Sequence, residues 1–172
     1  AAAVPVRVLD PQPGERIADL CAAPGGKSLQ LAASGANVIA VDISEHRLER
    51  LHENLKRTQL NAETIASDVF DFKPDEYMDA IVLDVPCSAT GTIRRHPDLP
   101  YLKTLKDMGG LLKLQAAMID HAAIMLRPGG RMVFCTCSLL PEEGEQQIKA
   151  ALARNPELSL RAITAENGIE PD

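Results

Sequence analysis

The stretch RIADLCAAPGGKS (residues 16–28) combines a short apolar run, a turn of small residues and the start of a helix. Gly25 and Gly26 let the backbone approach a ligand closely, and the amino end of the following helix favours a negative group. The glycine spacing matches neither the G-x-G-x-x-G of dinucleotide folds nor the longer Walker loop. The stretch therefore predicts a strand, a tight turn and a helix, whether or not the turn holds a ligand.

Working outward, four more short apolar runs are typical of buried parallel strands: residues 37–43, 63–67, 80–85 and 131–136. The longer segments between and after them carry Leu, Ile and Met at helical spacing: residues 28–34, 45–59, 108–126 and 142–155. RPGG (127–130) is expected to end a helix before the fifth strand, and residues 158–172 are a candidate sixth strand. This alternation predicts a mostly parallel, doubly wound sheet in a three-layer, Rossmann-like α/β fold.

Composition narrows the class of protein. The 172 residues are 45% hydrophobic but only 3% aromatic, so we expect one domain, residues 1–172, with an aliphatic core. The net charge of −6 argues against a nucleic-acid grip over the whole surface. No apolar run approaches the ~20 residues of a membrane helix and no signal peptide is apparent, so we expect a cytoplasmic protein with reduced cysteines.

Acidic residues follow the predicted strands at the edge where such sheets bind ligands. Asp42 ends the second strand, where a carboxylate accepts both hydroxyls of a ribose, and Asp68 ends the third, where it could accept from an adenine amino group. Either could instead cap a helix. Together with the 19–28 loop they indicate an adenosine cofactor, and S-adenosylmethionine fits better than NAD, so an NAD oxidoreductase is the weakest alternative.

The four cysteines divide into two kinds. Cys135 and Cys137 are too close along one strand for a disulfide, and no cysteine or histidine spacing suits zinc, so we expect no metal. Cys135 and Cys21 are expected to be buried filler. Cys137 leaves the fifth strand just before a helix start, which is expected to lower its pKa and make it a nucleophile. Cys87 occupies the neighbouring position, and two such thiols beside a methyl donor suggest chemistry on an electron-poor carbon.

Four blocks, DLCAAPGGKS, VDIS, LDVPCSATGTIRRHPDL and CTCSLLPEEGE, resemble the signature blocks of the Nop/Sun (Fmu-type) RNA cytosine-5 methyltransferases. The resemblance runs from about Val8 to Leu152 and is nearest to the bacterial members that modify small-subunit ribosomal RNA. It implies an S-adenosylmethionine site, with S-adenosylhomocysteine as product, that comprises Cys21, Ala22, Ala23, Pro24, Gly25, Gly26, Lys27, Asp42, Arg47, Asp68 and Asp84.

The resemblance also implies the roles of the thiols. Cys137 corresponds to the cysteine that attacks carbon 6 of cytosine, and Cys87 to the one that helps release the methylated product. Thiolate addition is needed because carbon 5 of cytosine is otherwise too weak a nucleophile to take a methyl group. Asp84 resembles the acid that contacts the ring edge near nitrogens 3 and 4, and Lys27 a lysine close to the same site.

The implied substrate is a flipped or single-stranded cytosine in RNA, most simply 16S ribosomal RNA. A basic cluster after the Cys87 block is expected to contact RNA phosphates, or to be a solvated loop: Arg94, Arg95, His96, Lys103 and Lys106. Family members carry an N-terminal RNA-binding region and a final strand that this sequence lacks, so we expect a monomeric catalytic fragment.

Two alternatives stay open at this point. An amino-group methyltransferase would carry an Asn/Asp-Pro-Pro-aromatic motif after the fourth strand, and DVPC (84–87) offers no aromatic. A non-catalytic RNA-binding or scaffold module could keep the same fold without transferring a methyl group.

Overall fold

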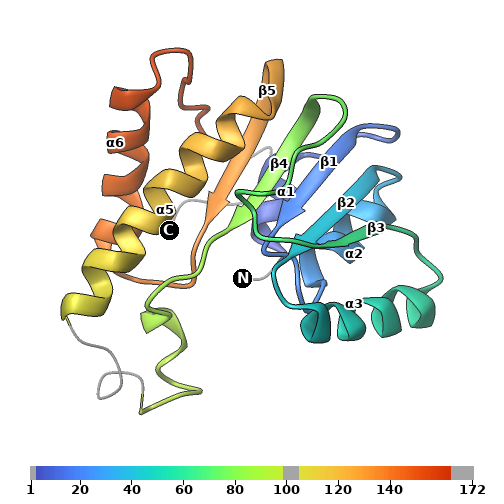
Figure 1. Ribbon diagram of the computed structural model, residues 1–172, viewed down its shortest axis with the longest axis horizontal. Helices are drawn as coiled ribbons and strands as arrows, with labels where there is room; N and C mark the ends of the chain where they lie inside the picture. The colour runs from blue at the N-terminus through green and yellow to red at the C-terminus, as the bar shows by residue number, and fades with distance from the viewer. Residues whose placement is uncertain (1–2, 99–104, 164–172) are drawn as a thin grey trace.

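The computed structural model describes residues 3–98 and 105–163. Its centre is a parallel sheet of β1 (Arg16–Leu20), β2 (Asn37–Asp42), β3 (Glu63–Ala66), β4 (Met78–Asp84) and β5 (Leu126–Cys135), shown in Figure 1. The strand order is β3-β2-β1-β4-β5, so the order reverses between β1 and β4. The predicted parallel α/β sheet is confirmed, and its ligand-binding edge lies at the carboxyl ends of these strands.

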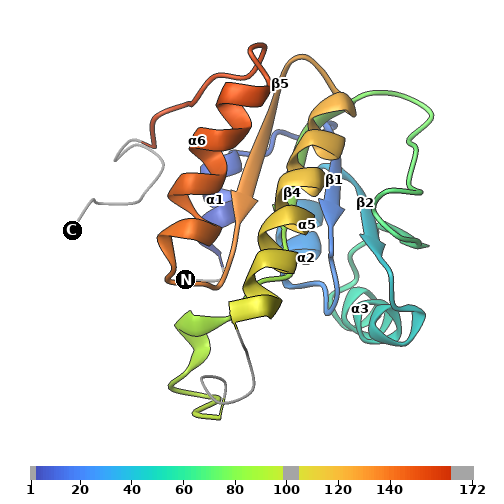
Figure 2. The ribbon, with the colours of Figure 1, turned by 60° about the vertical axis from the view of Figure 1, so that its left-hand side comes forward.

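Helices cover both faces of the sheet. α1 (Val4–Leu9), α2 (Gly26–Ala33) and α3 (Glu45–Thr58) lie on one face, and α5 (Leu105–Ile124) and α6 (Glu145–Arg154) on the other. Figure 2 shows α5 and α6 in front of the sheet, with α1 and α2 behind it. The short 3-10 turns η1 (Thr90–Thr92) and η2 (Pro141–Glu143) follow β4 and β5.

The packing of β4 explains why the sequences of the strands are continuously apolar. Ala80 and Val82 pack into the cluster under α1 and α2, whereas Ile81 and Leu83 pack into the cluster under α5. All four side chains are fully buried. Because both faces are covered, alternation of polar and apolar residues would be costly here.

The local sequence also explains where α3 begins and which of its faces is buried. This helix follows the carboxyl end of β2. Ser44 caps its start by accepting a hydrogen bond from the Arg47 amide at 3.3 Å. Leu48, Leu51 and Leu55 then recur at helical spacing and are buried against the sheet.

Several predicted boundaries are wrong. α5 ends at Ile124 and β5 already includes RPGG (127–130), because β5 pairs with β4 on both sides of this segment, at Leu126 and again from Arg131, with a register shift between. The predicted 142–155 helix is divided at Gly144 into η2 and α6. α1 was not expected, and its start carries Pro5, a residue that favours a first helical turn.

Residues 158–163 form no strand, and the rest of the candidate sixth strand, 164–172, lies outside the described residues. None of the described helices combines the length and apolar character needed to cross a bilayer.

Candidate active site

A pocket of about 440 Å³ opens at the carboxyl ends of the strands, the edge where the β4–η1 segment leaves the sheet in Figure 1. The structure brings eight of the sequence-predicted residues to its wall: Cys21, Ala23, Asp42, Arg47, Asp68, Asp84, Cys87 and Cys137. They come from the last residues of β2 and β4 and from the segments that follow β1, β2, β3, β4 and β5. Side chains far apart in the sequence therefore meet in one cavity.

Asp42 has a role that the sequence did not indicate. Its carboxylate is only 1% exposed and accepts hydrogen bonds from the amides of Ala23 and Ser44, both at 3.0 Å. Arg47 donates to the Ala23 carbonyl at 2.5 Å and lies 3.5 Å from Asp42. Asp42 and Arg47 thus hold the loop after β1 in place, besides lining the pocket.

The loop itself carries the other predicted cofactor residues. Ala22, Pro24 and Gly25 lie in the turn between β1 and α2, and Gly26 begins α2; none of these four residues lines the pocket. Gly25 adopts the left-handed conformation, with φ of 101°. This shape brings the amino end of α2 toward the pocket edge of the sheet.

Asp68 caps a turn and lines the pocket, and its predicted contact with an adenine amino group stays a prediction. One carboxylate oxygen accepts the Phe70 amide at 2.9 Å, which caps the turn after β3. The residue also lines the pocket together with Ile43 and Phe70, which are exposed at 69% and 37%. The pocket therefore has carboxylates beside apolar surface at this end.

Lys27 and Asp84 form an ion pair, with 2.5 Å between Nζ and Oδ2. Burial alone would lower the pKa of Lys27, but the hydrogen bond and the charge of Asp84 outweigh it and raise that pKa. The Cys135 thiol donates to the other Asp84 oxygen over 3.6 Å. Asp84 is thus held from two sides at the edge of the pocket.

A second carboxylate lies beneath this pair and was not predicted. Asp19 is fully buried, accepts a hydrogen bond from the Ser28 hydroxyl at 2.5 Å, and has no described partner for Oδ1. Burial raises the pKa of Asp19 to about 6. The only sequence signal was an acidic residue inside the apolar run RIADL.

The Cys87 and Cys137 sulfur atoms lie 3.3 Å apart, too far for a disulfide bond of about 2.05 Å but close enough for a thiol hydrogen bond. Cys137 is exposed and Cys87 half-buried. Burial and the hydrogen bond with Cys87 raise the pKa of Cys137 to about 11. The expectation of a lowered pKa is therefore wrong. Partial burial and the neighbouring thiol destabilise the thiolate of Cys137 more than nearby backbone amides stabilise it.

The other two cysteines are half-buried and pack against the core, Cys21 against the cluster under α5 and Cys135 against the cluster under α1 and α2. Cys21 lines the pocket, and burial with the nearby charge of Asp42 raises its pKa to about 12. Burial and the charge of Asp84 also raise the pKa of Cys135. Neither thiol is ionised near neutral pH.

Three residues of the predicted basic cluster, Arg94, Arg95 and His96, do not line the pocket. Arg94, Arg95 and His96 are exposed just after η1. Lys103 and the side chain of Lys106 fall outside the described residues. Within 3–98 and 105–163, no group of three or more His, Cys, Asp or Glu could hold a metal ion.

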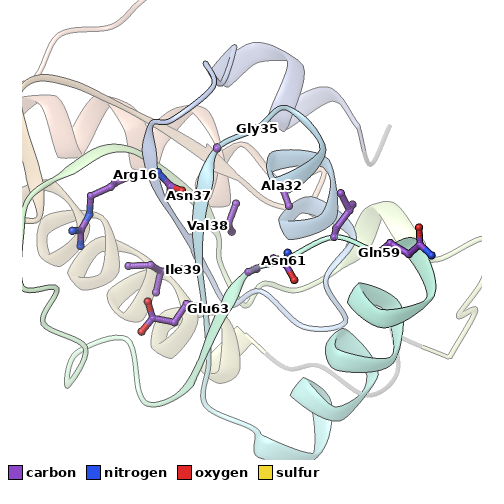
Figure 3. A pocket seen from close by; sticks show the side chains of 12 residues that line it. Arg16, Ala32, Gly35, Asn37, Val38, Ile39, Gln59, Asn61 and Glu63 are labelled. Atoms are coloured by element: carbon purple, nitrogen blue, oxygen red, sulfur yellow. The ribbon is translucent and has the colours of Figure 1, made fainter.

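A larger hollow of about 770 Å³ lies at the opposite ends of the strands, as Figure 3 shows. Its wall includes Asn37 and Glu63 at the starts of β2 and β3, and Gln59 after α3. None of the predicted site residues lines it. The pocket beside the cysteines is therefore the candidate active site, although it is the smaller of the two.

Comparison with known proteins agrees with this fold. Residues 6–171 match the family model described as 16S rRNA methyltransferase RsmB/F. The chain is 49% identical over 162 residues to ribosomal RNA small subunit methyltransferase B of Klebsiella pneumoniae (strain 342), with 91% of this chain and 38% of that protein covered. The corresponding protein of Yersinia pseudotuberculosis (serotype O:1b, strain IP 31758) is 50% identical over 160 residues, covering 90% and 37%.

Among solved structures, NSun6 from Pyrococcus horikoshii with SFG superposes with a TM-score of 0.80 at 35% identity, covering 89% of this chain and 40% of that one. A methyltransferase homolog from the same organism superposes with a TM-score of 0.78 at 36% identity, covering 88% and 49%. The chain thus spans less than half the length of these relatives. Its sheet has the Rossmann-like fold of S-adenosylmethionine-dependent methyltransferases, and the chain belongs to the RsmB/F family of 16S rRNA methyltransferases.

Proposed function

We propose that this chain is the catalytic domain of an enzyme that transfers a methyl group from S-adenosylmethionine to carbon 5 of a cytosine in 16S ribosomal RNA. The observation that carries the proposal is the pair of sulfur atoms, Cys87 and Cys137, 3.3 Å apart at the wall of the pocket that Asp84 shares. The names of the Klebsiella and Yersinia relatives support ribosomal RNA as the substrate.

The pocket fits an adenosine cofactor. Carboxylates of Asp42 and Asp68 stand beside the apolar surface of Ile43 and Phe70, which suits hydroxyls next to a flat ring. The residues that would hold it are the 21–27 loop with Asp42, Arg47, Asp68 and Asp84. When bound, S-adenosylmethionine supplies an electrophilic methyl group. The P. horikoshii NSun6 structure with SFG lends this assignment further support.

In the proposed chemistry, the Cys137 thiolate adds to carbon 6 of cytosine and forms an S–C bond, which makes carbon 5 nucleophilic enough to take the methyl group. A base then removes the carbon 5 proton, and the electron pair returns to the ring as the S–C bond breaks. We assign Cys87 to this release step. Asp84, held by Lys27, contacts the ring edge near nitrogens 3 and 4.

The target base must leave its stack to reach Cys137, so we propose a flipped or single-stranded cytosine. Arg94, Arg95 and His96, exposed after η1, are the proposed phosphate contacts. The monomeric state and the cytoplasmic location stay predictions.

Trapping with RNA that contains 5-azacytidine tests the two thiols separately. Cys137→Ala should abolish the covalent adduct, because no sulfur remains to attack carbon 6. Cys87→Ala should retain the adduct or accumulate RNA-linked protein, because attack is intact and release is slowed. The measurement is the amount of RNA-linked protein on denaturing gels over time.

Three outcomes would contradict the proposal. Equal adduct formation in both variants would remove the two-cysteine mechanism. A methyl group found on an exocyclic nitrogen of the modified base would favour an amino-group methyltransferase. Calorimetry without any S-adenosylmethionine binding would favour a scaffold module that only keeps the fold.

A further inference from the structure

Glu143 is a fully buried carboxylate beneath the two reactive thiols. Its neighbour Glu142 is exposed, as is Glu145, so the PEEGE stretch sends only one of its three acidic side chains inside. A buried carboxylate is costly unless hydrogen bonds replace its water. The surroundings of Glu143 must therefore supply donors.

Those donors come from both sides of the site. The Ser88 amide and the Gln115 side-chain amide donate to Oε1 at 2.8 and 2.9 Å, and the Ser88 hydroxyl donates to Oε2. Burial raises the pKa of Glu143, but hydrogen bonds from Ser138, Ser88 and Gln115 outweigh burial and hold the pKa below its usual value. Glu143 is therefore ionised at neutral pH, and its bonds are charge-assisted.

Gln115 connects Glu143 to the helices α5 and α6. Its side-chain nitrogen also donates to the Pro86 carbonyl at 3.0 Å, and Gln147 donates to its oxygen at 3.3 Å. Gln115 belongs to α5 and Gln147 to α6, and both are buried. The loop after β4 is thus tied to the helical layer through Gln115 and Glu143.

A second set of contacts joins the two cysteine loops directly. The Ser138 hydroxyl lies 3.0 Å from that of Ser88 and 3.1 Å from that of Thr90. The Gly91 amide donates to the Cys137 carbonyl at 2.9 Å. Ser88 and Ser138 each directly follow a cysteine, so these bonds set the distance between the two sulfur atoms.

We propose that Glu143 is a positioning residue that holds the Cys87 and Cys137 loops at the spacing required for attack and release. It acts through Ser88 and Gln115 and does not touch the reacting atoms. The inference rests on the proposed function for its catalytic consequence, but the thiol spacing is a property of the structure alone.

Two measurements test it, with Glu143→Gln as the variant because the shape is kept and the charge is lost. The first is oxidation by diamide, a diazene that takes two electrons and two protons from the two thiols and is reduced to a hydrazine. We expect the Cys87–Cys137 disulfide, mapped by mass spectrometry, to form about tenfold more slowly. This factor corresponds to a cost of about 1.4 kcal/mol for bringing the two sulfur atoms together.

The second measurement is the rate of adduct formation with 5-azacytidine RNA at saturating RNA, which we also expect to fall about tenfold. Binding of S-adenosylhomocysteine, measured by calorimetry, should stay unchanged, because Glu143 does not line the pocket. Glu142→Gln is the matched control, since it removes a neighbouring exposed charge and should match the unsubstituted protein in every assay.

Unchanged disulfide and adduct rates in Glu143→Gln would overturn the inference. If Glu143→Gln proves less stable in urea unfolding, Ser88→Ala is the second variant, because it removes one hydrogen bond to Glu143 with a smaller change. Ser88→Ala should also slow disulfide formation. An unchanged rate in Ser88→Ala would overturn the inference as well. Absence of any adduct in the unsubstituted protein would count against the proposed function, whereas the diamide result would still decide the role of Glu143.

Discussion

At the scale of single residues, the surroundings of Cys137, the proposed nucleophile, keep its thiol protonated at neutral pH. Burial and the adjacent Cys87 thiol raise its pKa from 9.0 to about 11. Below that pKa the thiolate fraction rises tenfold for each pH unit. Alkylation of Cys137 should therefore depend steeply on pH, and the proposed attack on cytosine requires that a base remove the thiol proton.

Alkylation of Cys137 by iodoacetamide should accelerate continuously from pH 7 to pH 9, because only the thiolate reacts. In Cys87→Ala the neighbouring hydrogen bond and competing charge are gone while burial remains. The pKa of Cys137 should then fall part of the way, and the rate at pH 8 should rise about threefold, the effect of half a pKa unit. The measurement is mass-spectrometric quantification of the alkylated Cys137 peptide.

A rate that levels off near pH 8 in the unsubstituted protein would contradict the raised pKa. An unchanged rate in Cys87→Ala would leave burial and the charge of Asp84 as the causes of the raised pKa of Cys137.

At the scale of elements, the β1–α2 turn depends on one glycine more than on its neighbour. A Cβ on Gly25 would lie 2.1 Å from Cδ1 of Leu51, a fully buried side chain of α3. The φ of 101° at Gly25 adds left-handed strain for any other residue. A Cβ on Gly26 would meet no atom within 4 Å.

We expect Gly25→Ala to lower the free energy of unfolding by about 3 kcal/mol, from overpacking against Leu51 and backbone strain. Gly26→Ala should leave it nearly unchanged, since Gly26 begins α2 and has open space beside it. Urea unfolding followed by circular dichroism compares the two. Equal losses in both variants would show that the clash with Leu51 is relieved by movement of α3.

At the scale of the whole molecule, Arg131 ties the start of the described chain to its last strand. From β5 it donates to the carbonyls of Leu9 and Asp10 at 2.7 and 2.8 Å. It also binds both carboxylate oxygens of Glu15, at 2.7 and 2.6 Å. This bidentate pair lowers the pKa of Glu15 and fixes α1 against the sheet.

Arg131→Met should therefore lower the free energy of unfolding by about 2 kcal/mol at pH 7, because three acceptors lose a charged donor. The contribution of Glu15 is present above its unfolded pKa of 4.5 and is lost as pH falls through its lower folded value. The difference between the variant and the unsubstituted protein should consequently shrink at pH 3. Urea unfolding at the two pH values measures it.

Lys149→Met serves as the control, because it breaks an exposed pair with Glu145 four residues earlier on α6. Such pairs add little, so no measurable change is expected. A loss in Arg131→Met no larger than in this control would mean that α1 is held by its apolar contacts alone.

Much of the fold could be predicted from the sequence because its signals are local. The apolar run RIADL forms β1, and AIVLD of the run AIVLDV lies in β4, since a strand buried on both faces must be continuously apolar. The ends of α5 and β5 were misplaced because Leu126, predicted to be helical, pairs with Met78 of β4, and RPGG lies at the register shift between this pair and the pair Arg131–Ala80. The division of the 142–155 helix was missed because burial of Glu143 depends on partners in α5 and the Cys87 loop.

By itself, the sequence determined the α/β class, the residue types of the candidate site and the strand ends that carry them, because periodicity and motif spacing are properties of neighbouring residues. Only the tertiary structure decided that Cys87 and Cys137, fifty residues apart, have sulfur atoms at 3.3 Å, and that Asp42 holds the loop after β1. It also decided the raised pKa of Cys137 and the burial of Glu143. The physical reason is that distance, desolvation and hydrogen bonding depend on which segments the sheet register and helix packing bring together.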